Sequence, residues 1–198
     1  MGKNRVNRRG STSSGSSAED EKVIANLTDN AIEWMTHVTD FIDENMTDEE
    51  IEYVNNHMES LDSISPDGIY RMENSSRTFS SQNITKGAEF SFDNDSFKAF
   101  SKNKDVVESM SLGTVFMGEP VIYHLSKGNA FDVYKQLKIN DYQKEEEVWV
   151  SEKQRFRVNE VSETTPERLG LDKKQSIPKK TWDKIKSKKI ILVEMTEV

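Results

Sequence analysis

The sequence predicts an α+β fold, built as a single domain behind a short N-terminal leader. Residues 19–62 carry apolar side chains at three- and four-residue spacing, which is typical of amphipathic helices. From residue 68 onward the apolar and aromatic residues come in short runs separated by turn residues, which is typical of strands. A length of 198 residues suits one domain of this kind.

Residues 1–18 have the composition of a disordered leader. They are basic and then rich in Ser and Gly, with almost no apolar side chain. Such a segment buries too little surface to offset the entropy lost when it becomes ordered. We therefore expect one domain over 19–198, with a helical front at 19–62 and a sheet core at 68–198.

Two helices are expected in the helical front. The first is indicated by an apolar stripe that consists of Ile24, Leu27, Ala31, Trp34, Met35, Val38, Phe41 and Ile42. The second begins at the capping box 47–50, whose acidic residues also suit the N-terminal end of a helix dipole. Its inward-facing residues are Ile51, Val54, Met58 and Leu61. A turn at 65–68 then ends the helical part.

Eight short strands are expected after this turn. Their ranges are 69–72, 89–92, 97–100, 121–125, 131–134, 146–150, 155–161 and 189–198. One helix over about 102–110 interrupts them, with Ser101 as its expected N-cap. Residues 162–188, which contain Pro166 and Pro178, are expected to be lysine-rich loops.

The composition excludes several classes of function. Without cysteine the chain has no disulfide framework, zinc ribbon, iron–sulfur cluster or thiol nucleophile. His37, His57 and His124 lie far apart, so we expect no metal site. There is no run of 18 apolar residues and no apolar stretch behind the basic N-terminus, so neither a transmembrane helix nor a secretory signal is expected. We expect a cytoplasmic monomer that does not bind membranes.

The charge is distributed unevenly along the chain. The first ten residues carry four basic side chains and no acid, so 23 basic residues face 35 acidic ones in the remainder, a net charge of −12. A body this acidic is a poor nucleic-acid binder. We expect at most weak contact with nucleic acid, through the leader or the 173–189 stretch.

Two common ligand-binding motifs are incomplete in this chain. Gly113 and Gly118 have the spacing of a phosphate-binding loop, but Glu119 and Pro120 follow where that loop needs Lys and then Ser or Thr. Residues 93–95 begin like a calcium loop that then lacks its glycine and its bidentate glutamate. Carboxylates remain the best candidates for catalysis.

Three adjacent acids, Glu145, Glu146 and Glu147, enter the expected strand at 146–150. Because strand side chains alternate, Glu145 and Glu147 should share one face, with Cα atoms roughly 6.5–7 Å apart. Two carboxylates so placed suit work on a single reacting centre. On composition alone, the plainer interpretation of solvent-facing charge is favoured.

Three segments keep a specific order along the chain: Tyr70-Arg71, Ala99-Phe100-Ser101 and Glu145-Glu146-Glu147. This order resembles the Arg–Ser–Glu branch of the mono-ADP-ribosyltransferases. That family has an arginine after an aromatic residue, then a Ser-x-Ser strand leading into a helix, then Glu-x-Glu entering a strand. The branch includes bacterial exoenzyme toxins and the small enzymes of T-even-type phages. The resemblance covers about residues 20–161.

The resemblance implies an enzyme that transfers ADP-ribose from NAD, its substrate, to a protein acceptor. Arg71 would bind the NAD phosphates and ribose, for which a guanidinium fork is well shaped. Ser101 would support the floor of the NAD site. Glu147 would hydrogen-bond the nicotinamide ribose and stabilise positive charge as the glycosidic bond breaks. Glu145 would orient or deprotonate the acceptor, and a Glu at this position resembles the arginine-modifying subset.

The resemblance also places Tyr70, Ala99 and Met110 at the NAD site. At three positions this sequence differs from the family's pattern. Ala99 stands where the first Ser is expected, Met72 replaces a small residue, and Met110 stands where an aromatic is frequent. The alternatives are an inactive binding module, as a virion or host-interaction protein, and an NAD glycohydrolase that uses water as acceptor. The implied fold has two small facing sheets, mixed or antiparallel, with NAD in the cleft and helices in front.

Overall fold

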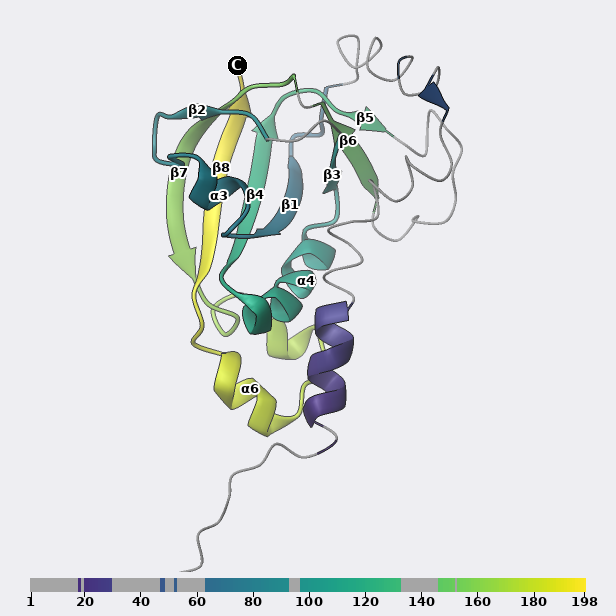
Figure 1. Cartoon of the computed structure of the whole chain (residues 1–198), viewed down its shortest axis with the longest axis vertical. Coiled ribbons are helices and arrows are strands. Elements are labelled where there is room, and N and C mark those ends of the chain that lie inside the picture. The colour runs from purple at the N-terminus through teal and green to yellow at the C-terminus, as the bar shows by residue number, and fades with distance from the viewer. Residues whose placement is uncertain are drawn as a thin grey trace, which may run out of the picture.

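The computed structural model describes residues 18, 20–29, 47–48, 52, 63–92, 97–132, 146–151 and 153–198. It has the expected α+β architecture, with the strands together, α4 (Lys104–Met117) and α6 (Lys179–Ile185) toward one end of them, and the short helix α3 (Thr78–Ser81) beside the strands (Figure 1). Residues 20–29 are helical, as expected for the first front helix. The expected leader, most of the second front helix, residues 93–95 and Glu145 lie outside the described residues.

All eight expected strands are present, most within about three residues of their expected bounds. They are β1 (Ile69–Asn74), β2 (Glu89–Phe90), β3 (Lys98–Ser101), β4 (Pro120–Lys127), β5 (Phe131–Asp132), β6 (Glu147–Val150), β7 (Phe156–Thr164) and β8 (Ile190–Glu197). Their order in the sheet is β2-β7-β8-β4-β1-β3-β6-β5. β4 and β8 run parallel and the other neighbouring pairs run antiparallel, so the sheet is mixed.

We expected two facing sheets, but the described strands form one hydrogen-bonded sheet of eight strands. The connection between its two parts is narrow, because β1 pairs with β3 at a single position, Tyr70 opposite Ser101. This pair joins the five-stranded part β2-β7-β8-β4-β1 to the three-stranded part β3-β6-β5. The two parts share one core, since Phe100 of the three-stranded part packs against Phe92, which also contacts Tyr123 and Phe156 of the five-stranded part.

The two faces of the sheet bury different clusters. One face points into what we call the inner core, whose largest members are Phe90, Phe92, Phe100, Tyr123 and Phe156. The opposite face of β1 and β4 is covered by α4 (Lys104–Met117), and we call it the α4 face. Because strand side chains alternate, neighbouring residues on each strand belong to opposite faces.

The helix α4 starts later and ends later than the sequence predicts. Asn103, not Ser101, is its N-cap, and the Asn103 side chain accepts hydrogen bonds from the backbone N–H groups of Asp105 and Val106. Past residue 110 the apolar periodicity is interrupted by polar residues that are nevertheless buried. Among them, the Thr114 hydroxyl donates to the Met72 sulfur at 3.0 Å. The helix nevertheless continues to Met117, and Leu112, Val115 and Phe116 keep a three- and four-residue spacing along its end.

The stretch at 162–188 is folded, contrary to the expectation of loops. It contains the end of β7, a 3₁₀ helix at Leu171–Lys173 and α6 (Lys179–Ile185). Only two residues of α6, Thr181 and Ile185, are buried. So few apolar positions give no helical period to detect.

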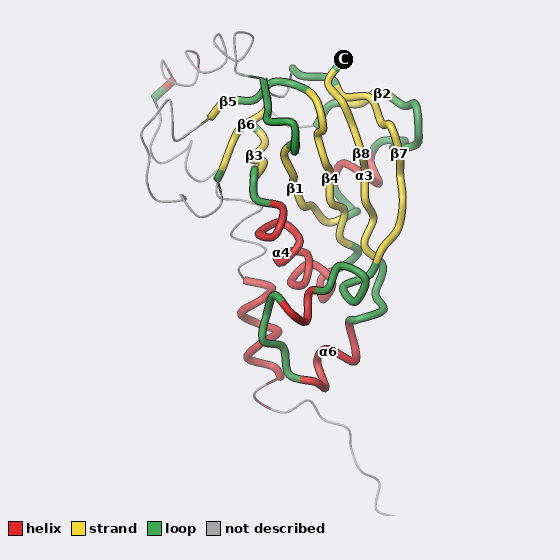
Figure 2. Tube along the Cα trace, turned by 180° about the vertical axis from the view of Figure 1, so that it is seen from behind, coloured by secondary structure: helices red, strands yellow, loops and turns green. Residues whose placement is uncertain are grey.

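The N-terminal helical residues and α6 lie together beyond one end of the sheet, as Figure 2 shows from behind. Thr181 donates a hydrogen bond of 2.6 Å to Asp20, and both side chains are buried. Leu27 packs against the cluster of Leu112, Leu171 and Ile185. The inward orientation that the apolar stripe predicts for Leu27 is therefore confirmed.

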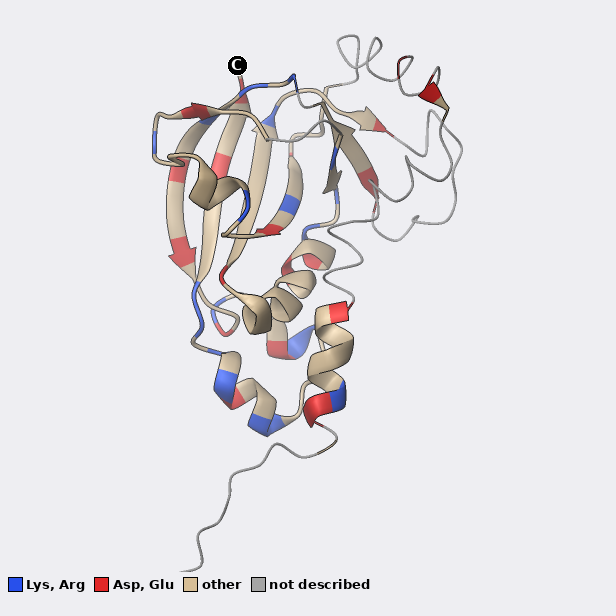
Figure 3. Ribbon diagram, viewed as in Figure 1, with Lys and Arg blue, Asp and Glu red and all other residues tan. Residues whose placement is uncertain are grey.

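Several lysines of the 173–189 stretch pair with acidic side chains of the same domain, and charges of both signs occur on α6 (Figure 3). The Lys174 ammonium lies 2.6 Å from Asp105 and 2.7 Å from Glu108, and Lys189 lies 2.9 Å from Glu119. Burial alone would lower the pKa of Lys174, but its hydrogen bonds to Asp105 and Glu108 outweigh burial and raise the pKa. These pairs attach the stretch to α4 and to the start of β4.

The turn at 65–68 forms as predicted and holds Gly68 in the left-handed region, at φ +77°. A Cβ at Gly68 would lie 2.3 Å from the His124 ring and 2.6 Å from the Leu125 carbonyl. Gly68→Ala is expected to lower the free energy of unfolding by about 2–4 kcal/mol, because it adds a steric clash to backbone strain. Urea unfolding measures this loss.

Gly87→Ala is the matched control for that substitution. Gly87 also has a positive φ, of +86°, but a Cβ there would meet no atom within 4 Å. It should lose only the backbone part, about 1–2 kcal/mol. Equal losses at the two positions would show that the contact between Gly68 and His124 does not restrict the turn.

No helix within the described part of the chain is both long and apolar enough to cross a bilayer.

Candidate functional site

The strand β6 brings Glu147 next to Ser101. The two residues face each other at one end of a ladder of four pairs between β3 and β6. Both side chains are buried, at 4% and 1% exposure. Because residues that face each other across antiparallel strands lie on the same side of a sheet, Glu147 and Ser101 share one face. The structure thus brings these two sequence-predicted residues together.

The row of facing residues that begins with Glu147 and Ser101 continues across three more strands. Ser101 faces Tyr70 on β1, Tyr70 faces His124 on β4, and His124 faces Glu194 on β8. We call Glu147, Ser101, Tyr70, His124 and Glu194 the polar row. Sequence reasoning missed His124 and Glu194, because their position in the row depends on strand order and register, which no spacing along the chain reveals.

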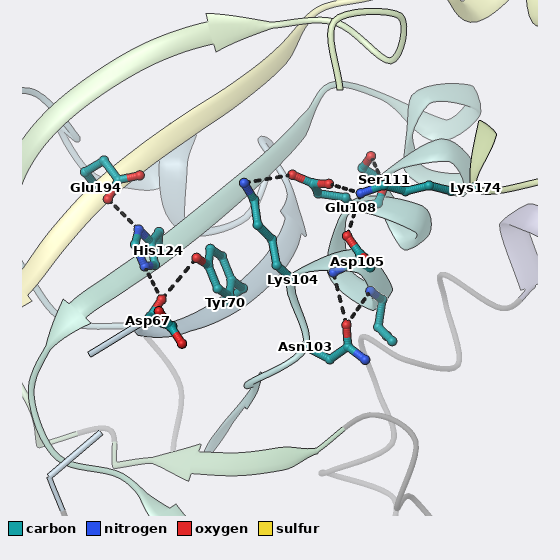
Figure 4. A network of polar contacts seen from close by, with 11 residues as sticks. Asp67, Tyr70, Asn103, Lys104, Asp105, Glu108, Ser111, His124, Lys174 and Glu194 are labelled. Atoms are coloured by element: carbon teal, nitrogen blue, oxygen red, sulfur yellow. Dashed lines mark hydrogen bonds and ion pairs between the residues drawn. The ribbon is translucent and has the colours of Figure 1, made fainter. Parts of the chain in front are cut away.

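Tyr70 is fixed by its neighbours in the polar row and by the preceding turn (Figure 4). Its ring stacks on the His124 ring, with centroids 4.3 Å apart and planes within 3°. Its hydroxyl donates to the Asp67 carbonyl at 3.1 Å. Nε2 of His124 lies 3.0 Å from the same carbonyl oxygen, and Nδ1 of His124 lies 2.6 Å from the Glu194 carboxylate. Burial, and then the charges of Glu194 and Asp67, raise the pKa of Tyr70, so its hydroxyl stays protonated at neutral pH.

Glu147 has a hydrogen-bond donor two residues along its own strand. The indole N–H of Trp149 donates to the Glu147 carboxylate. Trp149 is 1% exposed and stacks on Phe97 and on Phe131. The carboxylate is therefore held inside an aromatic cluster on the same face as Ser101.

The predicted placement of Glu145 and Glu147 on one strand face involves a residue outside the described part of the chain. β6 begins at Glu147, and Glu146 has a left-handed backbone, with φ +47°. Glu146 is therefore not part of the strand that the sequence predicts to begin there. The Glu146 carbonyl accepts a hydrogen bond from the Lys102 backbone N–H at 3.1 Å, which ties this turn to the end of β3. Glu145 itself lies outside the described residues.

The Arg71 side chain lies on the opposite face from Tyr70, in the inner core. Its Nε donates to Glu73 at 2.9 Å and one terminal nitrogen donates to the Ala99 carbonyl at 2.8 Å. Arg71 and Glu73 are both buried, at 3% and 2% exposure. Arg71 thus touches the backbone of β3 near Ser101, while its guanidinium points away from the face that carries Glu147.

Two buried oxygen atoms beside this ion pair have no hydrogen-bond partner among the described residues. They are Oε2 of Glu73 and the hydroxyl of Tyr123, which faces Arg71 across β1 and β4. Burial, and then the Glu73 charge, raise the pKa of Tyr123, while Arg71 acts in the opposite direction. Arg71, Glu73 and Tyr123 therefore form a polar cluster in an otherwise apolar core.

Met110 and Met72 belong to the α4 face. Met72 is fully buried there with Val107 and Ile122, and Met110 and Tyr70 pack against that cluster. Of the predicted site residues, the structure groups Tyr70, Ser101, Glu147 and Met110 on one side of the sheet. Ala99 lies on that side too, since it is two residues from Ser101 on β3. Arg71 lies on the other side.

No protein-family model and no curated protein matches this chain. Among solved structures it is similar to Plx2a, an ADP-ribosyltransferase toxin from Paenibacillus larvae, at 13% identity and a TM-score of 0.45 over 92% of this chain and 87% of that one. It is similar to C3stau2 from S. aureus with NAD, at 16% identity and a TM-score of 0.41 over 92% and 89%.

The chain is also similar to the enzymatic component C2-I of the C2-toxin from Clostridium botulinum, at 12% identity and a TM-score of 0.49. The match covers 91% of this chain and 46% of that one, so this chain spans about half the length of C2-I.

Proposed function

We propose that this protein transfers ADP-ribose from NAD to an arginine side chain of a protein acceptor and releases nicotinamide. The observation that supports this most is the placement of Ser101 and Glu147 as facing residues on β3 and β6, buried on one side of the sheet. The order of Arg71, Ser101 and Glu147 along the chain is the order that resembles mono-ADP-ribosyltransferases.

In this proposal Glu147 contacts the nicotinamide ribose. The bond between the nicotinamide nitrogen and C1′ of the ribose breaks, and positive charge develops on the sugar. A fixed carboxylate in a site with little water stabilises such charge strongly. Ser101 supports the floor of the site beside Glu147, and Tyr70, Ala99 and Met110 line the same side of the sheet.

The bond that forms joins C1′ to a guanidinium nitrogen of the acceptor arginine. That nitrogen loses one proton, which Glu145 accepts and passes to solvent. Nicotinamide leaves as a neutral molecule because it keeps the electron pair of the broken bond. The reaction therefore needs no other co-reactant.

Arg71 binds the NAD pyrophosphate in this proposal, which requires its guanidinium to turn out of the inner core toward the side of the sheet that carries Glu147 and to exchange partners. The guanidinium now contacts Glu73 and the Ala99 carbonyl. A phosphate oxygen takes the place of the Glu73 carboxylate, because both are anions that match the guanidinium fork.

The test incubates the full chain with a cell lysate and NAD labelled in its adenylate phosphate. We expect label on discrete protein bands, and excess unlabelled ADP-ribose should not reduce it. Release of nicotinamide without protein labelling would instead indicate an NAD glycohydrolase. Neither labelling nor nicotinamide release would contradict an enzymatic function and favour a binding module.

A further inference from the structure

The indole N–H of Trp149 donates a hydrogen bond to the Glu147 carboxylate. This N–H is the one hydrogen-bond donor that a tryptophan side chain has. Trp149 and Glu147 are two residues apart on β6, so their side chains lie on the same face. Both are almost completely buried. A buried Trp needs some acceptor for this group, and here the acceptor is the carboxylate proposed to act on NAD.

The indole ring is held in place from both neighbouring strands. Phe97, directly before β3, stacks on it at 5.4 Å with planes 13° apart. Phe131 of β5 stacks on it at 6.2 Å and 28°. β6 lies between β3 and β5 in the sheet. With the ring fixed from two sides, the direction of the N–H bond is fixed too, and so is the carboxylate oxygen that accepts it.

Hydrogen bonds to ionised groups are about twice as strong as those between neutral groups. A carboxylate that must meet developing charge works best when it does not reorient during the reaction. The cluster of Trp149, Phe97 and Phe131 supplies that rigidity from the hydrophobic side of Glu147. Ser101 borders Glu147 on the neighbouring strand.

We propose that Trp149 is a positioning residue for Glu147, which orients its carboxylate toward the nicotinamide ribose. This inference rests on the proposed function. It assigns a role to a residue for which the resemblance gives none at the NAD site. It predicts that the indole N–H, rather than the bulk of the ring, is what the reaction requires.

Trp149→Phe tests this because it keeps a six-membered aromatic ring between Phe97 and Phe131 and removes the donor together with the rest of the pyrrole ring. We expect kcat for nicotinamide release to fall about 10- to 100-fold. The KM for NAD should change less than threefold, because the carboxylate acts on charge that develops only after NAD has bound, as the glycosidic bond breaks. Trp182→Phe on α6 is the matched control, since it makes the same chemical change away from β6 and should retain the wild-type kcat.

A second measurement reports on the contact without using activity. In a ¹H–¹⁵N spectrum, the indole resonance of Trp149 is the one missing from Trp149→Phe. In Glu147→Gln this resonance should move by more than those of Trp34 and Trp182, because its acceptor changes from a carboxylate to an amide.

The outcomes separate this inference from the proposed function. Full kcat in Trp149→Phe, in a protein whose activity depends on Glu147, overturns the positioning role and leaves the function intact. An unmoved indole resonance in Glu147→Gln overturns the contact regardless of activity. If the wild-type protein neither labels acceptors nor releases nicotinamide, the proposed function and this role fail together.

Discussion

Replacing Glu73 by glutamine is expected to lower the free energy of unfolding by about 3–5 kcal/mol. The substitution keeps the side-chain volume but leaves the Arg71 guanidinium charged and unpaired inside the inner core. Both side chains are nearly inaccessible to water, so solvent cannot replace the lost partner. Removing one partner of a buried ion pair lowers the free energy of unfolding by far more than the intact pair adds to it.

Urea unfolding followed by circular dichroism measures the loss, and Tyr123→Phe is its matched control. Tyr123 belongs to the same polar cluster, but its hydroxyl has no hydrogen-bond partner among the described residues. Removing it should leave stability unchanged or raise it by about 1 kcal/mol. A loss below 1 kcal/mol for Glu73→Gln would contradict the buried ion pair.

Replacing Glu147 by glutamine is expected to reduce ADP-ribose transfer about 10²- to 10³-fold, the usual effect of removing one electrostatic contact to a transition state. The amide keeps the shape of the side chain and can still accept a hydrogen bond from Trp149. It lacks the negative charge that stabilises the sugar as nicotinamide leaves. The Kd for NAD, measured by calorimetry, should therefore rise by a much smaller factor than kcat falls.

Glu163→Gln provides the matched control for this loss. Glu163 is an exposed carboxylate on β7 that pairs only loosely with Lys189, at 3.5 Å. It should retain the wild-type rate and stability. Equal rates for the wild-type protein and Glu147→Gln would remove Glu147 from the mechanism.

The strands could be predicted from the sequence because each combines apolar or aromatic residues with flanking turn residues. β1, β4 and β8 illustrate this, and their observed bounds lie within about three residues of the expected ones. The end of α4 was obscured by buried polar residues, and the whole of α6 could not be predicted in the same way. Their buried positions include Ser111, Thr114 and Thr181, and polar residues of this kind do not produce an apolar period.

The candidate site was predictable only where it depends on local order along the chain. Ser101 and Glu147 come together as their segments suggest, whereas His124 and Glu194 join the polar row through strand register. The orientation of Arg71 depends on Glu73, two residues away on the same strand face. Nothing in the sequence distinguishes that carboxylate from a solvent-facing one, so the ion pair could not be foreseen.

The most direct test of the proposed site is a crystal structure of the full chain with a non-hydrolysable NAD analogue. The nicotinamide ribose should lie within hydrogen-bond distance of the Glu147 carboxylate and beside Ser101. The pyrophosphate should contact Arg71, with the Arg71–Glu73 ion pair broken. An analogue bound away from β3 and β6, or one that leaves Glu147 without a contact, would contradict the account.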